Sequence, residues 1–411
     1  MAANDTTATP GTTGTTGTVV ALGLAQTLAW ASSFYLPAVL ATPMARELGV
    51  ATPTVFAAFS GALVIGAVVG PAAGRRIDRH GGRGLLMATN GLFALGLVAL
   101  SQAQGLAGLV AAWAVLGVAM GAGLYDTAFA TLVRLYGTAS RNPITGITLI
   151  AGFASTVGWP ASAAMAEAWG WRGACLGWAA LHVLVGLPLN ALLPRAPPAS
   201  VPAAATPVRA DDPAGEPAEA ATPTAPPPWR NLLLLAFAFT ATRFVGTAIG
   251  THLPGLLMAL GATLAAAVAA GALVGPAQVA GRLLEFGVLR RVHPLLSARL
   301  AALAHPIGAL ALLVVGLPAA ALFALLHGAG NGILTIAKGT LPLVLFGAHG
   351  YGARQGWLSA PGLVLQALAP WLFGLALAQS ASTALMLSGG LTMAALAALL
   401  ALRVTPARPE R

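Results

Sequence analysis

Residues 66–83, GAVVGPAAGRRIDRHGGR, change abruptly from apolar chain to dense charge. The segment 66–74 has no ionisable side chain, whereas the segment 75–83 holds four arginines, an aspartate and a histidine. Such a boundary is typical of a membrane-spanning helix whose end emerges from hydrocarbon into water. We therefore expect a span that ends near residue 73 and is followed by a charged loop.

The composition of the whole chain also indicates a membrane protein. Of the 411 residues, 57% are hydrophobic and only 8% are charged, and the mean hydropathy is +0.81. Soluble domains are much less apolar. Several long runs, such as 355–402, lack Asp, Glu, Lys and Arg. Because about 20 apolar residues cross the hydrocarbon core as a helix, such a run must contain two spans. Helices are expected because lipid offers the backbone no hydrogen-bond partner.

Turn signals between the apolar runs predict an all-α, polytopic membrane protein with twelve transmembrane helices. The expected spans are residues 18–40, 53–73, 84–101, 107–133, 143–166, 173–193, 231–259, 263–286, 295–316, 319–346, 355–378 and 382–402.

The distribution of arginine predicts the orientation of these spans. With the N-terminus inside the cell, only Arg46 and Arg172 of the arginines outside the spans fall on the outer side. Positive residues are retained on the cytoplasmic side, so this pattern supports both the span count and the topology. We expect a multi-pass protein of the plasma membrane, the bacterial inner membrane, with both termini cytoplasmic. The net charge of +10 then needs no nucleic acid as a partner.

The apolar and polar segments divide the chain into five parts. Residues 1–17 are expected to be a disordered N-terminal tail, and residues 18–194 a bundle of six helices. Residues 195–230 are rich in Pro and Ala and predict a cytoplasmic linker. A second six-helix bundle is expected at 231–403, with a C-terminal tail at 404–411.

The cysteine content and the motifs exclude several functions. The single cysteine, Cys175, excludes an intrachain disulfide and leaves no metal cluster of the usual spacing. We interpret it as a small buried apolar residue. The motifs GxSxG, HExxH and GxxxxGK[ST] are absent. We therefore expect no metal, no cofactor and no enzyme activity.

An internal repeat relates the two halves. The segment 66–72, GAVVGPA, recurs as GALVGPA at 271–277, and GAG at 121–123 recurs at 328–330. Both pairs lie in corresponding spans of the two halves. This order indicates two bundles related as parallel repeats about an axis along the membrane normal.

With twelve spans, two halves and a long central linker, the chain resembles the major facilitator superfamily (MFS) of transporters. The resemblance is most specific in the loop after the second span, which in the family has the motif Gly-x-x-x-Asp-Arg/Lys-x-Gly-Arg/Lys-Arg/Lys. The matching residues are Gly74, Asp78, Arg79, Gly81 and Arg83, whereas Gly82 stands where a basic residue is usual.

The resemblance implies that this loop is a conformational latch between the halves. An aspartate at this place can accept hydrogen bonds from a helix N-terminus or an arginine. The alternative is that the arginines only set the topology. In the second half, Arg282 and Glu285 stand three residues apart on one helix face. They indicate either a degenerate latch or a structural ion pair.

Three ionisable residues inside spans are the best candidates for the transport site. Each costs about 2.5–3.5 kcal/mol to insert at the helix centre, so a function is expected for Asp126, Arg243 and Lys338. The resemblance implies that the first, fourth, seventh and tenth helices line a central cavity. Asp126 would then exchange a proton, while Arg243 and Lys338 would hold an anionic group. The alternative is a static buried ion pair between Asp126 and one of the two cations.

Further candidates carry weaker signals. Tyr35 and Tyr125 supply phenol groups, Asn331 an amide, and His252 a group that titrates near neutral pH. The first span adds Gln26, Trp30 and Ser33, and the eleventh adds Gln366. For each of these the alternative is a contact with a neighbouring helix or with lipid. Four tryptophans, Trp159, Trp169, Trp171 and Trp178, predict an interfacial belt at the outer membrane surface.

Together these features predict a secondary active transporter that works by alternating access. We expect its partners to be a small, anionic organic solute, protons and the lipid bilayer, and we expect a monomer. A multidrug or metabolite efflux permease is the alternative within the same class. A membrane receptor or scaffold that does not transport is the alternative of another class, and it would tend to lose charges inside the bundle.

Overall fold

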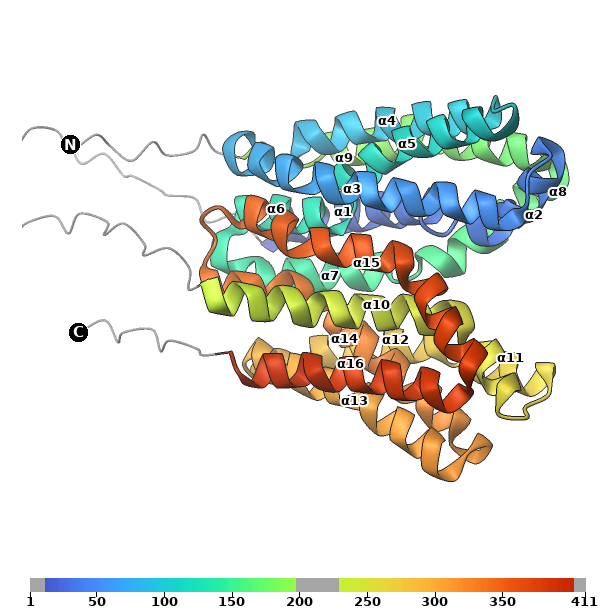
Figure 1. Ribbon diagram of the computed structural model, residues 1–411. Coiled ribbons are helices and arrows are strands. Elements are labelled where there is room, and N and C mark those ends of the chain that lie inside the picture. Colours follow the sequence, from blue (N-terminus) through green and yellow to red (C-terminus); the bar gives the residue numbers. More distant parts are fainter. Residues whose placement is uncertain (1–11, 197–228, 403–411) are drawn as a thin grey trace, which may run out of the picture.

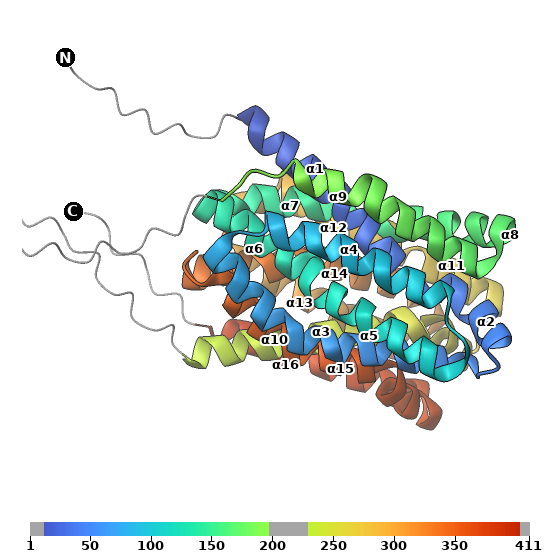
Figure 2. The same ribbon diagram turned by 90° about the horizontal axis from the view of Figure 1, so that it is seen from above.

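The computed structural model describes residues 12–196 and 229–402, and these residues form helices without a β-strand. The ends of both ranges lie at the same end of the molecule (Figures 1 and 2). We name this the linker end, after the segment 197–228 between the two ranges. The expected linker and C-terminal tail lie almost wholly outside the described residues, as do residues 1–11 of the expected N-terminal tail.

The N-terminal bundle occupies the upper part of Figure 1. Its first helix begins at Thr12, earlier than the expected start of the first span. The helices of this bundle are α1 (Thr12–Ser32), α2 (Pro37–Leu48), α3 (Thr52–His80), α4 (Arg83–Ser101), α5 (Gly105–Gly123), α6 (Tyr125–Tyr136), η1 (Gly137–Ser140), α7 (Arg141–Ala151), α8 (Ala154–Leu181), the π-helix η2 (His182–Gly186) and α9 (Leu187–Ala191).

The C-terminal bundle lies beside it. Its helices are α10 (Trp229–Ala259), α11 (Leu264–Ala272), α12 (Val274–Gly287), η3 (Leu289–Arg291), α13 (Pro294–Val315), η4 (Leu317–Ala319), α14 (Ala320–Phe346), α15 (Tyr351–Gln379) and α16 (Ala381–Leu400).

Several spans are interrupted, so the number of helices exceeds the number of spans. The first span breaks before Pro37, whose ring favours a helix start, and the fourth breaks at Leu124. Gly170, at φ 71°, turns the chain inside α8 and separates the fifth span from the sixth. Nine segments of the described residues are apolar and long enough to cross a membrane, and one of them, Gly105–Ala191, is 87 residues long. If that segment is counted as three spans and α11–α12 as one further span, the helices of the described residues are consistent with twelve membrane spans.

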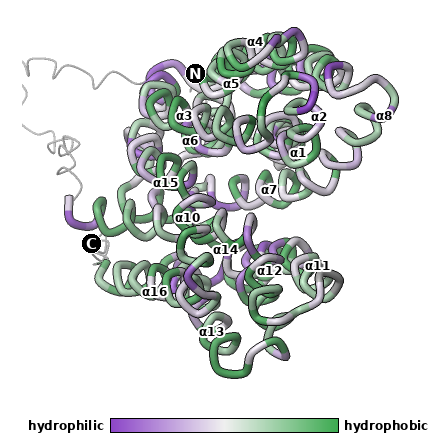
Figure 3. The backbone as a smooth tube through the Cα atoms, turned by 45° about the vertical axis from the view of Figure 1, so that its right-hand side comes forward, coloured by the Kyte–Doolittle hydropathy of each residue, from purple (hydrophilic) through white to green (hydrophobic). Residues whose placement is uncertain are grey.

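The surface of the bundles suits lipid. Large apolar side chains such as Val68, Leu184 and Val314 are 72–76% exposed. Hydrophobic residues also predominate along most helices in Figure 3. A soluble protein would bury such residues, whereas a bilayer solvates them.

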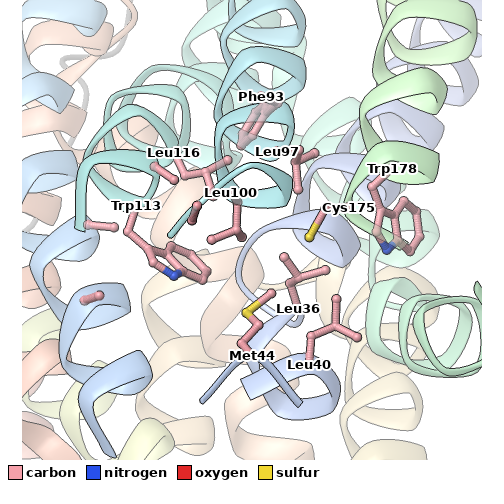
Figure 4. Close-up of a cluster of buried hydrophobic side chains, with 14 of the residues drawn as sticks. Leu36, Leu40, Met44, Phe93, Leu97, Leu100, Trp113, Leu116, Cys175 and Trp178 are labelled. Atoms are coloured by element: carbon pink, nitrogen blue, oxygen red, sulfur yellow. The ribbon is translucent and has the colours of Figure 1, made fainter. Parts of the chain in front are cut away.

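The core of the N-terminal bundle holds Cys175 and several large apolar side chains (Figure 4). Cys175 is fully buried, as expected. The predicted tryptophan belt is wrong for Trp171 and Trp178, which are 4% and 3% exposed. Their indole N–H groups donate to Glu47 (2.5 Å) and Ser162 (3.0 Å), and these partners compensate for burying a polar group. Trp159 and Trp169 are exposed.

The repeated glycine segments perform corresponding packing roles in the two halves. Gly121 on α5 lies against the backbone of Gly66 on α3, so a Cβ atom at Gly121 would come within 2.7 Å of it. In the other half, Gly328 on α14 lies against Val274 and Ala277 of α12 at a similar distance. Glycine thus brings the second and fourth spans of each half into backbone contact.

Candidate functional site

The break in the fourth span is the centre of the candidate site. Leu124 is extended (φ −88°, ψ −163°), so the hydrogen-bond ladder stops after Gly123 and starts again in α6. The carbonyl of Gly123 accepts a hydrogen bond from Gln26 of α1 at 2.8 Å. The break places Tyr125 and Asp126 in the first turn of α6, near the middle of the bundle.

Asp126 contacts the other half through a neutral partner. Its Oδ1 atom accepts a hydrogen bond from Gln355 Nε2 of α15 at 2.9 Å. The same amide donates to the carbonyl of Lys338 on α14 at 3.2 Å. Among the described residues, Asp126 forms no ion pair with Arg243 or Lys338, so the alternative interpretation, a static ion pair, is not what the structure shows.

Two cations of the C-terminal half complete the charged part of the site. Arg243 on α10 is half-buried and donates to Gln366 Oε1 at 3.3 Å. The ammonium group of Lys338 interacts electrostatically with both Arg243 and Asp126. Lys338 has no hydrogen-bond or ion-pair partner for this group within residues 12–196 and 229–402. The structure therefore brings the three intramembrane charges together, with the cations on one half and the acid on the other.

The N-terminal half contributes an aromatic wall. Trp30 lies 4.9 Å from Tyr125 and 6.2 Å from Tyr35, measured between ring centroids. Tyr125 stacks on Phe129 at 5.3 Å, and Tyr35 meets Trp159 edge-on at 5.9 Å. The wall thus offers flat apolar surface opposite the cationic half.

Several polar atoms around the break are buried without a partner in the described part of the chain. They are Gln26 Oε1, Trp30 Nε1, Gln355 Oε1 and Arg282 Nε. Burying such atoms without a hydrogen bond costs about 1–3 kcal/mol each.

Two predicted site residues lie elsewhere. Asn331 lines a small pocket of about 20 Å³ between helices of the C-terminal bundle, beside His305 and His327. His252 donates from Nε2 to the carbonyl of Pro370 at 2.8 Å and so joins α10 to α15. This contact matches the alternative interpretation of His252 as a polar residue between helices.

The histidines beside Asn331 were missed by sequence reasoning. The Nδ1 atoms of His305 and His327 lie 2.8 Å apart, so one ring must donate and the other must accept. Both residues are buried. A signal was available, because a histidine inside a predicted span is as unusual as a charge there.

At the linker end, Asp78 binds the N-terminus of α15. Its two carboxylate oxygens accept hydrogen bonds from the backbone N–H groups of Gly352 and Ala353, both at 2.8 Å. These donors have no partner within the helix, and the helix dipole favours a negative charge there. Gly74 allows this approach, since any Cβ atom would overlap the carbonyl of Gly352.

The other residues of the expected latch lie around this contact. Gly81, at φ 77°, ends α3 in a conformation that favours glycine. Arg79 is exposed and Arg83 is half-buried. Neither arginine has a hydrogen-bond or ion-pair partner among residues 12–196 and 229–402. The structure thus places only the aspartate and the glycines of the motif in the contact.

The opposite edge of the linker end is joined by α7 and α12. Glu285 does not pair with Arg282, the partner that its own helix offers, but with Arg141 of α7 at 3.1 Å. Arg141 also donates to the carbonyls of Leu289 (3.2 Å) and Val292 (3.1 Å). Sequence reasoning placed Arg141 only among the topology-setting arginines.

His293 lies beside this edge, just before α13. Its Nδ1 atom accepts a hydrogen bond from the backbone N–H of Leu295 at 3.1 Å. Partial burial lowers the pKa of His293, and the nearby Arg141 and Arg299 lower it further. A lower pKa favours the neutral ring, whose Nδ1 atom can accept this hydrogen bond.

Between the two edges, apolar side chains of both halves close the linker end. Ile77, Phe129 and Ile144 of the N-terminal half belong to one buried cluster with Leu343 and Tyr351 of the C-terminal half. Gly339 leaves room for Phe129 and Ile144, since a Cβ atom there would come within 2.8 Å of both. The bundle is thus sealed at the linker end.

Comparison with solved structures shows the same fold in transporters. The human organic anion transporter MFSD10 (TETRAN) has a TM-score of 0.68 and 16% identity, over 94% of this chain and 99% of its own. The proton:xylose symporter XylE, bound to 6-bromo-6-deoxy-D-glucose, has a TM-score of 0.70 and 13% identity, over 93% and 95%. FucP in the outward conformation has a TM-score of 0.67 and 12% identity, over 93% and 97%.

Comparison of sequences supports the same assignment through the family model. No curated protein matches the sequence significantly. The model of the Major Facilitator Superfamily, however, matches residues 22–334. Because this match covers more than half of the chain, the chain belongs to the Major Facilitator Superfamily of transporters.

Proposed function

We propose that this protein carries a small organic anion across the membrane by alternating access and couples this movement to protons. One observation carries the proposal: the half-buried Lys338 interacts electrostatically with both Arg243 and Asp126, and neither cation has an ion-pair partner among the described residues. Buried charges without a partner are costly. A solute that brings a carboxylate or a similar group would supply the partner.

The acid of the site supports proton coupling. When Asp126 is ionised, it accepts the hydrogen bond from Gln355 and attracts Lys338. Protonation removes the negative charge of Asp126 and weakens both interactions. The positive charge of Lys338 is then no longer offset and attracts an anionic solute more strongly. Proton binding and anion binding would then favour one another, as a symporter requires. In an antiporter, the proton and the anion would instead occupy the site in turn.

Transport into proteoliposomes tests this function. Counterflow is measured against a panel of solutes, including organic anions, at two internal pH values. We expect Asp126→Asn to retain counterflow but to lose accumulation driven by a pH gradient, and Arg243→Ala to lower anion flux at least tenfold. Glu167→Gln, which removes an exposed acid, is the matched control.

The outcomes separate the alternatives. Flux that ignores both Asp126→Asn and the pH gradient would rule out proton coupling. Flux of large apolar solutes that tolerates Arg243→Ala would support the efflux permease, for which the aromatic wall is the specific observation. No flux of any solute would support the receptor.

We further propose that the linker end faces the cytoplasm. The conformation that is sealed at this end would then be the one that opens toward the outside of the cell. Because Cys175 is buried, a membrane-impermeant maleimide should not label the unchanged protein. We expect Arg79→Cys, at the linker end, to react only after cells are permeabilised, and Ala51→Cys, between α2 and α3, to react in intact cells. The reverse pattern would contradict the orientation.

A further inference from the structure

Arg282 on α12 contacts the N-terminal half of the protein. Its Nη1 atom donates to the carbonyl of Thr148 on α7 at 3.2 Å. The guanidinium occupies space that glycine leaves free, because a Cβ atom at Gly152 would overlap it. Arg282 also interacts electrostatically with the phenols of Tyr35 and Tyr125. The guanidinium therefore lies against α7, within electrostatic reach of the aromatic wall.

Among residues 12–196 and 229–402, the charge of Arg282 has no acidic partner. Glu285, the acid one turn further along α12, is paired with Arg141. Arg282 is only 7% exposed, and its Nε atom is buried without a hydrogen bond in the described part of the chain. A guanidinium has five N–H groups and a carboxylate takes two of them from one edge. The free Nε–H lies on such an edge, so the site lacks an anion there.

The wall beside Arg282 determines what the rest of the solute should be. Trp30 and Tyr125 pack against each other with their ring centroids 4.9 Å apart and their planes tilted by 44°, and Trp30 Nε1 is a buried donor without a partner among the described residues. Flat apolar surface of this kind binds a ring better than a flexible chain, because rings stack with little loss of conformational freedom.

From this placement we infer that the solute is an aryl carboxylate, whose carboxylate binds Arg282 while its ring lies against Trp30 and Tyr125. This inference rests on the proposed transport of an organic anion and names the class of that anion. Arg243 and Lys338 remain available for a second polar group of the solute, on the far side of the site.

Binding to the purified full-length protein tests the inference without transport. Isothermal titration calorimetry compares 1-naphthoate with 1-naphthamide, which lacks the charge, and with hexanoate, which lacks the ring. We expect 1-naphthoate to bind at least tenfold more tightly than either. Arg282→Gln should lower the affinity for 1-naphthoate at least tenfold and leave 1-naphthamide unchanged.

Two variants show that a loss is specific. Arg282→Lys keeps the charge but cannot donate two hydrogen bonds from one edge. Its affinity for 1-naphthoate should therefore lie between those of the unchanged protein and Arg282→Gln. Arg291→Gln removes an exposed arginine and should bind like the unchanged protein. Equal binding of 1-naphthoate by Arg282→Gln, or equal binding of hexanoate by the unchanged protein, would overturn the inference. Absence of 1-naphthoate binding would also overturn the inference. If the same preparation transported another organic anion, the proposed function would still stand.

Discussion

Gly74→Val is expected to hold the protein open at the linker end and to abolish transport. A side chain at this position would overlap the carbonyl of Gly352, so α3 and α15 must separate. Separation breaks both hydrogen bonds from Gly352 and Ala353 to Asp78. Hydrogen bonds to a charged group contribute about 1.5–3 kcal/mol each, so the ratio of closed to open molecules should fall by roughly a hundredfold or more.

Spin labels across this edge measure the change. His80 and His349 are exposed near the ends of α3 and α15, and Cys175 is replaced by alanine to leave only the two labelled cysteines. We expect a longer label-to-label distance in Gly74→Val and counterflow at least tenfold slower. Gly61→Val on the same helix is the matched control, because no atom lies within 4 Å of its Cβ position. An unchanged distance would show that glycine is not what permits closure.

The sequence predicts the framework of this protein well because the membrane imposes strong local rules. Charge-free runs are long enough to reveal spans, and arginines reveal their ends. Asp78 could be assigned to a latch because its partner, a helix N-terminus, needs no particular side chain. The breaks are harder to predict: Pro37 signals one, whereas Leu124 carries no signal of its own.

The other contacts between the halves could not be predicted, because they depend on the direction of side chains on different helices. An ion pair with a cation was the alternative interpretation of Asp126, but its carboxylate accepts a hydrogen bond from the amide of Gln355 on α15. Glu285 was considered a partner for Arg282, three residues away on its own helix. The approach of α7 instead brings Arg141 to Glu285 and leaves Arg282 to the interior.

Arg141→Glu is expected to open the other edge of the linker end, where α7 meets α12. The substitution removes the ion pair with Glu285, which is 4% exposed, and places a second negative charge beside it. Removing one partner of a buried pair costs about 3–5 kcal/mol. We expect counterflow to slow at least tenfold, and labels at the exposed residues Thr138 and Arg290 to move apart.

Exchanging the two charges distinguishes the contribution of the ion pair from that of the hydrogen bonds that Arg141 donates to backbone carbonyls. Arg141→Glu combined with Glu285→Arg restores opposite charges but not the hydrogen bonds to the carbonyls of Leu289 and Val292. It should therefore recover part of the flux and of the closed distance. Arg291→Glu reverses an exposed charge next to this edge and should change neither quantity. If the swap is no better than Arg141→Glu alone, the carbonyl bonds hold this edge. The ion pair would then only neutralise a buried acid, and closure would depend on the apolar cluster and on Asp78.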